Sequence, residues 1–324
     1  MRLLRHAASA WLVIAVLCGC ALQPTKLTTA NTSDLPAQVE LAQVPFFAQQ
    51  QYQCGPAALA TVLQAAGVSV LPGDLVEDVY LPGRKGSLQL ELLAATRRRD
   101  HVPYLLAESL PAVLEQVAVG RPVLVMQNLG LKVAPAWHFA VLVGYDLQAR
   151  TLILRSGTTR RLVIGMDRFI KTWARAQSWG LIVLAPDQLP KNPDLERYLT
   201  AAAGLEAVGR LDAAAQAYAS ARAQWPHSVW PAVGLANISY RKGDLRSAED
   251  GYVGALALDA DNIVAHNNLA EILAGRGCFA AARVHIARAA ALATGTTLES
   301  AVAATAQKVD TAASFVDDAA CPQP

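Results

Sequence analysis

The residues with the clearest chemical potential lie between positions 44 and 68, where a cysteine opens an apolar helical pattern. Cys54 is followed by Gly55 and Pro56 and then by a run of mostly good helix formers over residues 57–63. Proline is tolerated in a first helical turn because its missing N–H would have no partner there. The pattern predicts Cys54 at a helix N-terminus, where the dipole and free amides stabilise a thiolate, the nucleophilic form.

A second polar group precedes this cysteine. The side-chain amide of Gln49 can lie beside the backbone N–H of Cys54, and two donors so placed would hold the oxyanion of a tetrahedral intermediate. The alternative interpretation is that Cys54 is a small buried residue at the start of an ordinary helix.

A base for this thiol is sought among six histidines. His6 lies in a segment expected to be removed, and three others fall in a separate helical region: His227, His266 and His285. Of the remaining two, His138 stands at the start of a β-branched and aromatic run, 137–146, that is typical of a core strand. His101 lies in what looks like an exposed connection, so His138 is favoured. The alternative is a histidine that only satisfies a backbone group at a strand end.

These segments resemble the papain-like cysteine peptidases related to bacteriocin-processing, double-glycine-leader peptidases. The resemblance covers residues 43–186 and rests on three matching features: Val44-Pro45-Phe46-Phe47 with Gln49, Cys54-Gly55-Pro56-Ala57-Ala58-Leu59, and His138-Phe139-Ala140-Val141-Leu142-Val143-Gly144-Tyr145. It implies that Cys54 is the nucleophile, His138 the base and Gln49 the oxyanion donor. Members often carry the glutamine one residue further from the cysteine, where this chain has Ala48, and Gln50 is the alternative donor.

A third residue should orient the histidine. Asp146 is eight residues along the same strand, about 26 Å away at roughly 3.3 Å per residue, so it cannot contact His138. Antiparallel return of the next strand brings residues 156–158 opposite His138. The family usually has Asp or Asn at this point, and Ser156 is the best match. A serine accepts a hydrogen bond from the imidazole but offers no charge. The alternative for residues 155–159 is an ordinary turn.

The N-terminus predicts export and a lipid anchor. Arg2 and Arg5 precede an apolar stretch, 7–17, that is too short to span a bilayer but typical of a secretory signal. The following Leu-Cys-Gly-Cys resembles a bacterial lipobox, which implies a signal peptide over 1–19 and acylation of Cys20. Ala21, by analogy with Gram-negative sorting, favours the outer membrane, facing the periplasm. The alternative is a plain signal peptide.

The cysteine count fits an exported protein with one reactive thiol. Five cysteines include Cys18, lost with the signal, and Cys20. A bridge between Cys278 and Cys321 would leave Cys54 free. There is no C-x-x-C pair and no histidine cluster with metal-ligand spacing, so we expect no metal and no cofactor. Charge is balanced at 28 basic and 26 acidic residues, and nothing suggests a nucleic acid partner.

The elements that must position the site predict an α+β domain. Residues 20–42 are rich in Thr, Ser, Asn and Pro and indicate a linker behind the lipidated N-terminus. The 43–186 segment then predicts helices first and antiparallel strands after, which is an α+β pattern. The expected helices cover 88–98, 110–118 and 166–176, and the expected strands cover 102–106, 123–127, 137–144, 151–154 and 180–185. This matches a papain-like layout with the nucleophile on a helix and the histidine on the sheet.

A period of 34 residues dominates the Ala-rich region that follows. It is carried by glycines and by small residues five and twelve positions later: Gly209, Gly243 and Gly277; Ala214, Ala248 and Ala282; Ala221, Ala255 and Ala289. Small residues at this period are the tetratricopeptide signature. We therefore expect an all-α domain of three repeats over 192–295, then a capping helix and tail over 296–324.

The sequence favours a lipid-anchored cysteine peptidase whose repeats bind a substrate or protein partner. Three alternatives stay open: an acyl transferase that uses the same thioester, a catalytically inactive lipoprotein acting through the repeat surface, and a scaffold of an envelope secretion machine. The uncharged Ser156 favours inactivity, whereas the joint presence of Cys54, His138 and Gln49 favours catalysis. The repeats could also merely brace the enzyme.

Overall fold

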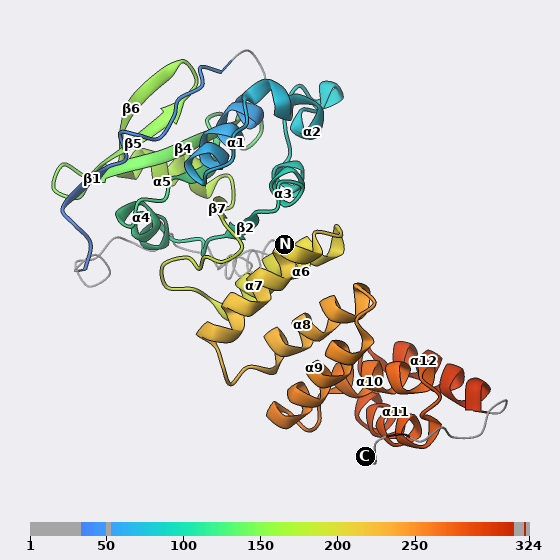
Figure 1. Ribbon diagram of the computed structural model, residues 1–324. Helices are drawn as coiled ribbons and strands as arrows, with labels where there is room; N and C mark the ends of the chain where they lie inside the picture. The colour runs from blue at the N-terminus through green and yellow to red at the C-terminus, as the bar shows by residue number, and fades with distance from the viewer. Residues whose placement is uncertain (1–33, 50–52, 314–320, 322–324) are drawn as a thin grey trace, which may run out of the picture.

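The computed structural model describes residues 34–49, 53–313 and 321. It confirms the predicted fold class, with an α+β sheet domain followed by an all-α region. Figure 1 shows the sheet domain in blue to green, with the yellow to red helical hairpins leading away from one end of it. The predicted signal peptide, Cys20 and Gln50 lie outside the described residues.

A single antiparallel sheet organises the first domain. Within the described residues it has seven strands: β1 (Gln38–Glu40), β2 (Val102–Leu105), β3 (Val123–Asn128), β4 (Trp137–Asp146), β5 (Thr151–Ser156), β6 (Thr159–Gly165) and β7 (Gly180–Leu184). Their order is β2-β7-β3-β4-β5-β6, and β1 pairs with the far end of β4. The most buried strands, β3, β4 and β7, are the apolar runs that the sequence predicts.

Helices cover both faces of this sheet. α1 (Cys54–Ala65), α2 (Val76–Val79) and α3 (Gln89–Arg97) pack on one face, together with two short 3₁₀ turns, Pro72–Leu75 and Pro82–Arg84. α4 (Leu110–Ala118) and α5 (Met166–Ala174) pack on the other. The alternation of β4 divides the two cores, since Phe139, Val141 and Val143 face α1 while Ala140 and Leu142 face α4 and α5.

Two strands correct the sequence-based expectations. Residues 38–40, assigned to the linker, form β1 and pair with residues 144–146 of β4. Three residues are too few to show an alternating pattern. Residues 159–165, for which the sequence analysis predicts no strand, form β6, whose side chains are nearly all exposed. A strand exposed on both faces lacks the apolar alternation by which strands are recognised.

The second region consists of helical hairpins with the predicted period. The pairs are α6 (Leu195–Ala207) with α7 (Leu211–Gln224), α8 (Val229–Arg241) with α9 (Leu245–Leu258), and α10 (Ile263–Gly275) with α11 (Phe279–Ala293), followed by α12 (Glu299–Ala313). Gly209, Gly243 and Gly277 end the first helix of each pair with φ near 80°, a left-handed conformation that glycine adopts without penalty. The alanines at the two periodic columns are all fully buried, because adjacent helices approach closely there.

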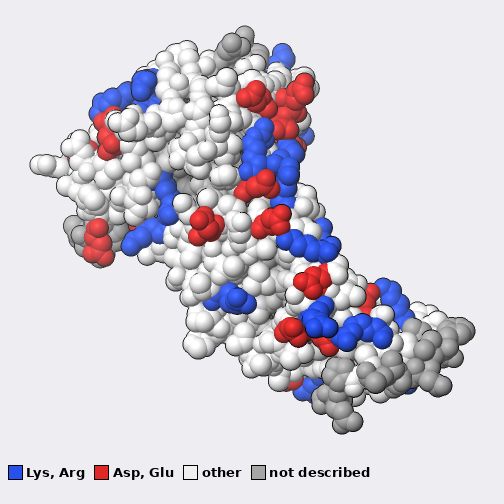
Figure 2. Space-filling model, in the orientation of Figure 1, with Lys and Arg blue, Asp and Glu red and all other residues white. Residues whose placement is uncertain are grey.

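Ion pairs follow one side of the molecule from the sheet domain into the hairpins. They join neighbouring segments: Arg98 and Arg99 with Asp78, Arg210 with Asp100, Arg241 with Glu206, Lys242 with Asp212, and Arg276 with Glu249. Figure 2 shows this side as a band of blue and red side chains over α2–α3 and the ends of the hairpins. Exposed pairs contribute about 0–1 kcal/mol each, so most of the stability of the stack comes from its buried apolar contacts, the periodic alanines among them.

The first hairpin packs directly on the edge of the sheet. Tyr198 and Leu205 of α6 are fully buried in the same apolar cluster as the β2 residue Tyr104. The Tyr104 hydroxyl accepts a hydrogen bond from the backbone N–H of Asp194 at 3.2 Å. Gly204 faces the Arg97 side chain so closely that a Cβ there would lie 2.5 Å from Nε. α6 therefore covers the outer strand of the sheet, which would otherwise be an exposed edge.

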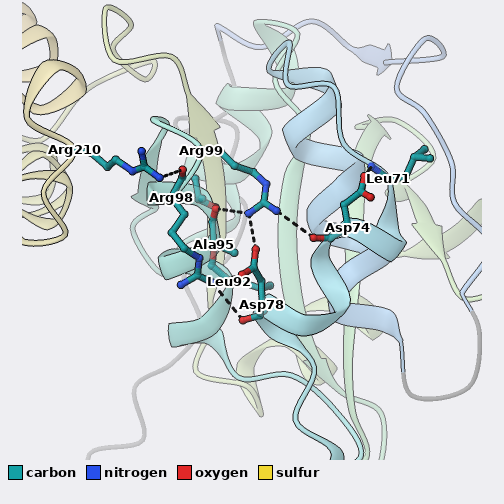
Figure 3. A network of polar contacts seen from close by, with 9 residues as sticks. Leu71, Asp74, Asp78, Leu92, Ala95, Arg98, Arg99 and Arg210 are labelled. Atoms are coloured by element: carbon teal, nitrogen blue, oxygen red, sulfur yellow. Dashed lines mark hydrogen bonds and ion pairs between the residues drawn. The ribbon is translucent and has the colours of Figure 1, made fainter.

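A polar network ties the α2–α3 segment to this hairpin (Figure 3). Arg99 Nη1 donates to Asp78 Oδ2 at 2.8 Å and to the Ala95 carbonyl at 2.9 Å. Arg210, in the turn between α6 and α7, donates to the Arg98 carbonyl at 2.7 Å. The end of α3 is thus held from both domains.

The predicted disulfide is confirmed, because Cys278 and Cys321 are bonded and the remaining described cysteine, Cys54, is free. The bridge spans 43 residues and fastens the segment after α12 to the start of α11. No helix in the described part of the chain is both long and apolar enough to cross a membrane.

Candidate active site

Cys54 is the first residue of α1, as the sequence predicts. An α-helix leaves its first N–H groups without intrahelical acceptors, so the backbone amide of Cys54 is a donor at the helix N-terminus. Gly55 allows a close approach of the loop before α3, since a Cβ at this position would lie 2.2 Å from Ser87 Oγ. The Cys-Gly-Pro sequence thus combines a helix start with room for a neighbouring segment.

His138 is the second residue of β4, and its ring is held by Ser156 at the end of β5. The distance from Nε2 to Ser156 Oγ is 2.9 Å. When Nε2 carries the hydrogen and donates it to the serine, Nδ1 presents its lone pair as a base. In this tautomer the free lone pair on Nδ1 can accept a thiol proton.

The sheet register explains this contact. Val141 of β4 lies opposite Arg155 of β5, so the next pair places Ala140 opposite Ser156. His138 is two residues before Ala140 and shares its face of the sheet, which makes Ser156 a diagonal neighbour within reach of a long side chain. A register shift between Leu142 and Gly144 sets this alignment.

Gln49 is tied to the same end of the sheet by two hydrogen bonds. Its backbone N–H donates to the Gly157 carbonyl at 3.0 Å, and its side-chain Nε2 donates to the Phe139 carbonyl at 3.3 Å. A primary amide carries two N–H groups, so the second one remains for another acceptor. The β5–β6 turn thus holds both the glutamine and, through Ser156, the histidine.

One cavity of about 810 Å³ brings three of the four predicted residues together. Gln49, Cys54 and His138 all line it. Its wall also includes Ser87 and the exposed indole of Trp137, which the sequence analysis did not single out. Ser87 Oγ is buried without a hydrogen-bond partner in the described structure, and a buried hydroxyl in that condition favours a ligand that can pair with it.

The environment of His138 favours its neutral form. Burial lowers the pKa of the imidazole, because desolvation disfavours the charged ring. His101, the other histidine left open by the sequence, has its Nδ1 2.7 Å from the Arg99 carbonyl at the end of α3 and does not line this cavity. Among the described residues, no three His, Cys, Asp or Glu side chains gather in an arrangement that could hold a metal ion.

A comparison of the chain with known protein families agrees with this arrangement of a cysteine at a helix start and a histidine on a strand. Residues 41–179 match the Peptidase_C39 like family. This C39-like region contains Gln49, Cys54, His138 and Ser156. A search of curated proteins found no match.

Several solved structures resemble parts of the chain, each over less than half of its length. A C39-like protein from Bacillus anthracis is 18% identical and has a TM-score of 0.38, covering 46% of this chain and 98% of its own. A double glycine motif protease from an AMS/PCAT transporter, solved with a leader peptide, is 22% identical with a TM-score of 0.33, covering 44% and 91%. The type III secretion translocator chaperone SycD of Yersinia enterocolitica is 16% identical with a TM-score of 0.34, covering 36% and 82%.

Proposed function

We propose that the sheet domain is a cysteine peptidase that cleaves peptide bonds through a thioester on Cys54. The observation that carries this proposal is the cavity shared by Cys54, His138 and Gln49, with Ser156 fixing Nε2 of the histidine. The match of residues 41–179 to the Peptidase_C39 like family supports it.

Each step of the reaction has a group suited to it. Nδ1 of His138 accepts the thiol proton, and Sγ of Cys54 attacks the carbonyl carbon of the scissile bond. The oxyanion is held by the Cys54 N–H and the second N–H of Gln49 Nε2. His138 then returns the proton to the leaving amine as the C–N bond breaks, and water hydrolyses the thioester to a carboxylic acid and the free thiol.

The proposal is tested by the pH dependence of iodoacetamide alkylation at Cys54, measured by peptide mass spectrometry on the chain lacking residues 1–20. Burial lowers the pKa of His138, so the neutral base persists into mildly acidic solution, and we expect the acid limb to have its midpoint below 6.5, the ordinary histidine value. In His138→Ala this acid limb should disappear. A free-thiol profile in the unaltered chain would contradict the proposal.

The Ser156 contact makes a separate prediction. Ser156→Ala should lower the alkylation rate at pH 7 by roughly tenfold, because the ring loses the hydrogen bond that holds it in place. Ser156→Asp should raise the pKa of His138 and move the acid limb to higher pH, since a carboxylate stabilises the imidazolium. Thr158→Ala, two residues along the turn, is the matched control and should leave the profile unchanged. If both variants kept the profile of the unaltered chain, Ser156 would have no effect on the ring.

We further propose that the helical hairpins form tetratricopeptide repeats that bind a peptide or protein partner. Supporting this, a cavity of about 720 Å³ lies between α6 and α8. Its lining is partly apolar and includes Leu199, Trp230 and Val233. Trp230 is half exposed, and an aromatic side chain in such a position suits a peptide anchor.

We also propose that the protein is exported and anchored in the cell envelope through lipid on Cys20. The Cys278–Cys321 disulfide supports export, because such bonds persist in oxidising compartments. Mass spectrometry of the mature N-terminus would show the acylated cysteine, whereas an unmodified terminus would indicate a plain signal peptide.

A further inference from the structure

A second cavity lies on the other side of the histidine. It has a volume of about 520 Å³ and is walled by β5, β6 and α5. His138 lines both this cavity and the one that contains Cys54, and Ser156 lines only the second. The hydrogen bond between His138 and Ser156 therefore forms part of the wall of the second cavity.

α5 presents three cations to this second cavity. Arg168, Lys171 and Arg175 follow at spacings of three and four residues, which places them on one stripe of the helix. The opposite stripe, with Phe169 and Trp173, is buried against the sheet. Thus the sequence of α5 separates a mostly apolar, buried side from a cationic one.

None of these three cations has a carboxylate partner in the described structure. Asp167, next to Arg168 on the helix, pairs with Arg150 instead. Arg175 donates to the Gly130 carbonyl, a neutral group. Arg168 and Lys171 each lack an ion pair with any described residue.

No carboxylate lines either cavity among the described residues. The charged side chains around the Cys54 cavity are Arg84 and Lys85, and those around the second are the three cations of α5. A concave site lined by charge of one sign concentrates its potential and attracts the opposite charge. Guanidinium groups pair with carboxylates through two parallel hydrogen bonds.

We propose that the second cavity binds a carboxylate of the peptide substrate, through Arg168 and Lys171, beside the His138–Ser156 hydrogen bond. The inference rests on the proposed peptidase function and specifies its substrates as peptides with an acidic side chain near the scissile bond. The bound carboxylate places a negative charge near the imidazolium that forms when Cys54 is deprotonated. It thereby supplies the charge that Ser156 lacks.

The test measures the pKa of His138 by NMR in the full chain carrying Cys54→Ala, with ¹³C-labelled histidine and the resonance assigned through His138→Gln. Two blocked peptides are compared, acetyl-Ala-Ala-Glu-Ala-Ala-amide and the same peptide with Gln. The Glu peptide should raise the pKa of His138 by about one unit, as an opposite charge within about 4–6 Å does, and the Gln peptide should leave it unchanged.

Charge variants locate the effect. Arg168→Gln with Lys171→Gln should abolish the response to the Glu peptide. Arg222→Gln with Arg246→Gln removes the same charge from α7 and α9, outside all three cavities described above, and should preserve it. Equal responses to the two peptides, no response to either at millimolar concentration, or an equal response to acetate at the same ionic strength would overturn the proposal. Because the Cys54→Ala chain lacks the nucleophile and cannot hydrolyse the peptides, this result is independent of whether the protein is a peptidase.

Discussion

Cys54→Ala and His138→Ala should each lower peptide hydrolysis by about 10³-fold or more, because both the nucleophile and its base are needed to form the thioester. The structure identifies His138, and not His101, as the histidine on which hydrolysis should depend. His138 lines the cavity of Cys54 and has its other ring nitrogen fixed by Ser156, whereas the ring of His101 contacts the backbone at the end of α3. Hydrolysis would be followed by mass spectrometry with a library of blocked peptides.

His101→Ala is the matched control, since it removes the same side chain at a position away from the cavity, and its hydrolysis rate should equal that of the unaltered chain. Full activity in His138→Ala would instead exclude the general-base mechanism. If neither the unaltered chain nor its variants cleave any peptide while the hairpins still bind a partner, the inactive-scaffold alternative is favoured.

Local patterns account for what could be predicted from sequence. The start of α1 at Cys54 depends on its own first turn, and the 34-residue period depends on small residues at helix contacts, such as Ala214 and Ala248. The position of Ser156 near His138 could also be predicted, because two strands joined by a short turn have a nearly fixed register. These features follow from interactions between residues close in the chain or repeated along it.

The features that escaped prediction depend on contacts between distant segments. Ser87 lies beside Gly55 only because the loop before α3 returns across α1, and no periodicity marks it. The α5 cations have the ordinary sequence appearance of a solvated helix face. Their position beside His138 follows from the packing of α5 against β3 and β6, which sequence spacing does not specify.

The sheet domain should fail to fold when the first hairpin is removed. A fragment of residues 34–190 would lose Tyr198, Ala202 and Leu205 from its main apolar cluster and expose the edge of β2. Loss of one large buried side chain alone typically costs about 3–5 kcal/mol, against the ~5–15 kcal/mol by which a domain is stable. We expect the fragment to aggregate or to lack a cooperative thermal transition in near-UV circular dichroism.

A fragment of residues 34–225 separates this effect from loss of the repeats in general. It keeps α6 and α7, and with them the cover over β2 and the Arg210 contacts to the end of α3. It should therefore melt cooperatively and retain the alkylation profile of Cys54, although its exposed α7 face will lower its solubility.

The point variants Tyr198→Ala and Tyr252→Ala make the same comparison in the full chain, because both tyrosines are fully buried but only Tyr198 belongs to the cluster shared with the sheet. If residues 34–190 folded as stably as residues 34–225, the first hairpin would be a separable module. If they do not, it is part of the sheet domain, and a partner that binds the cavity between α6 and α8 would contact a helix that also packs on the sheet.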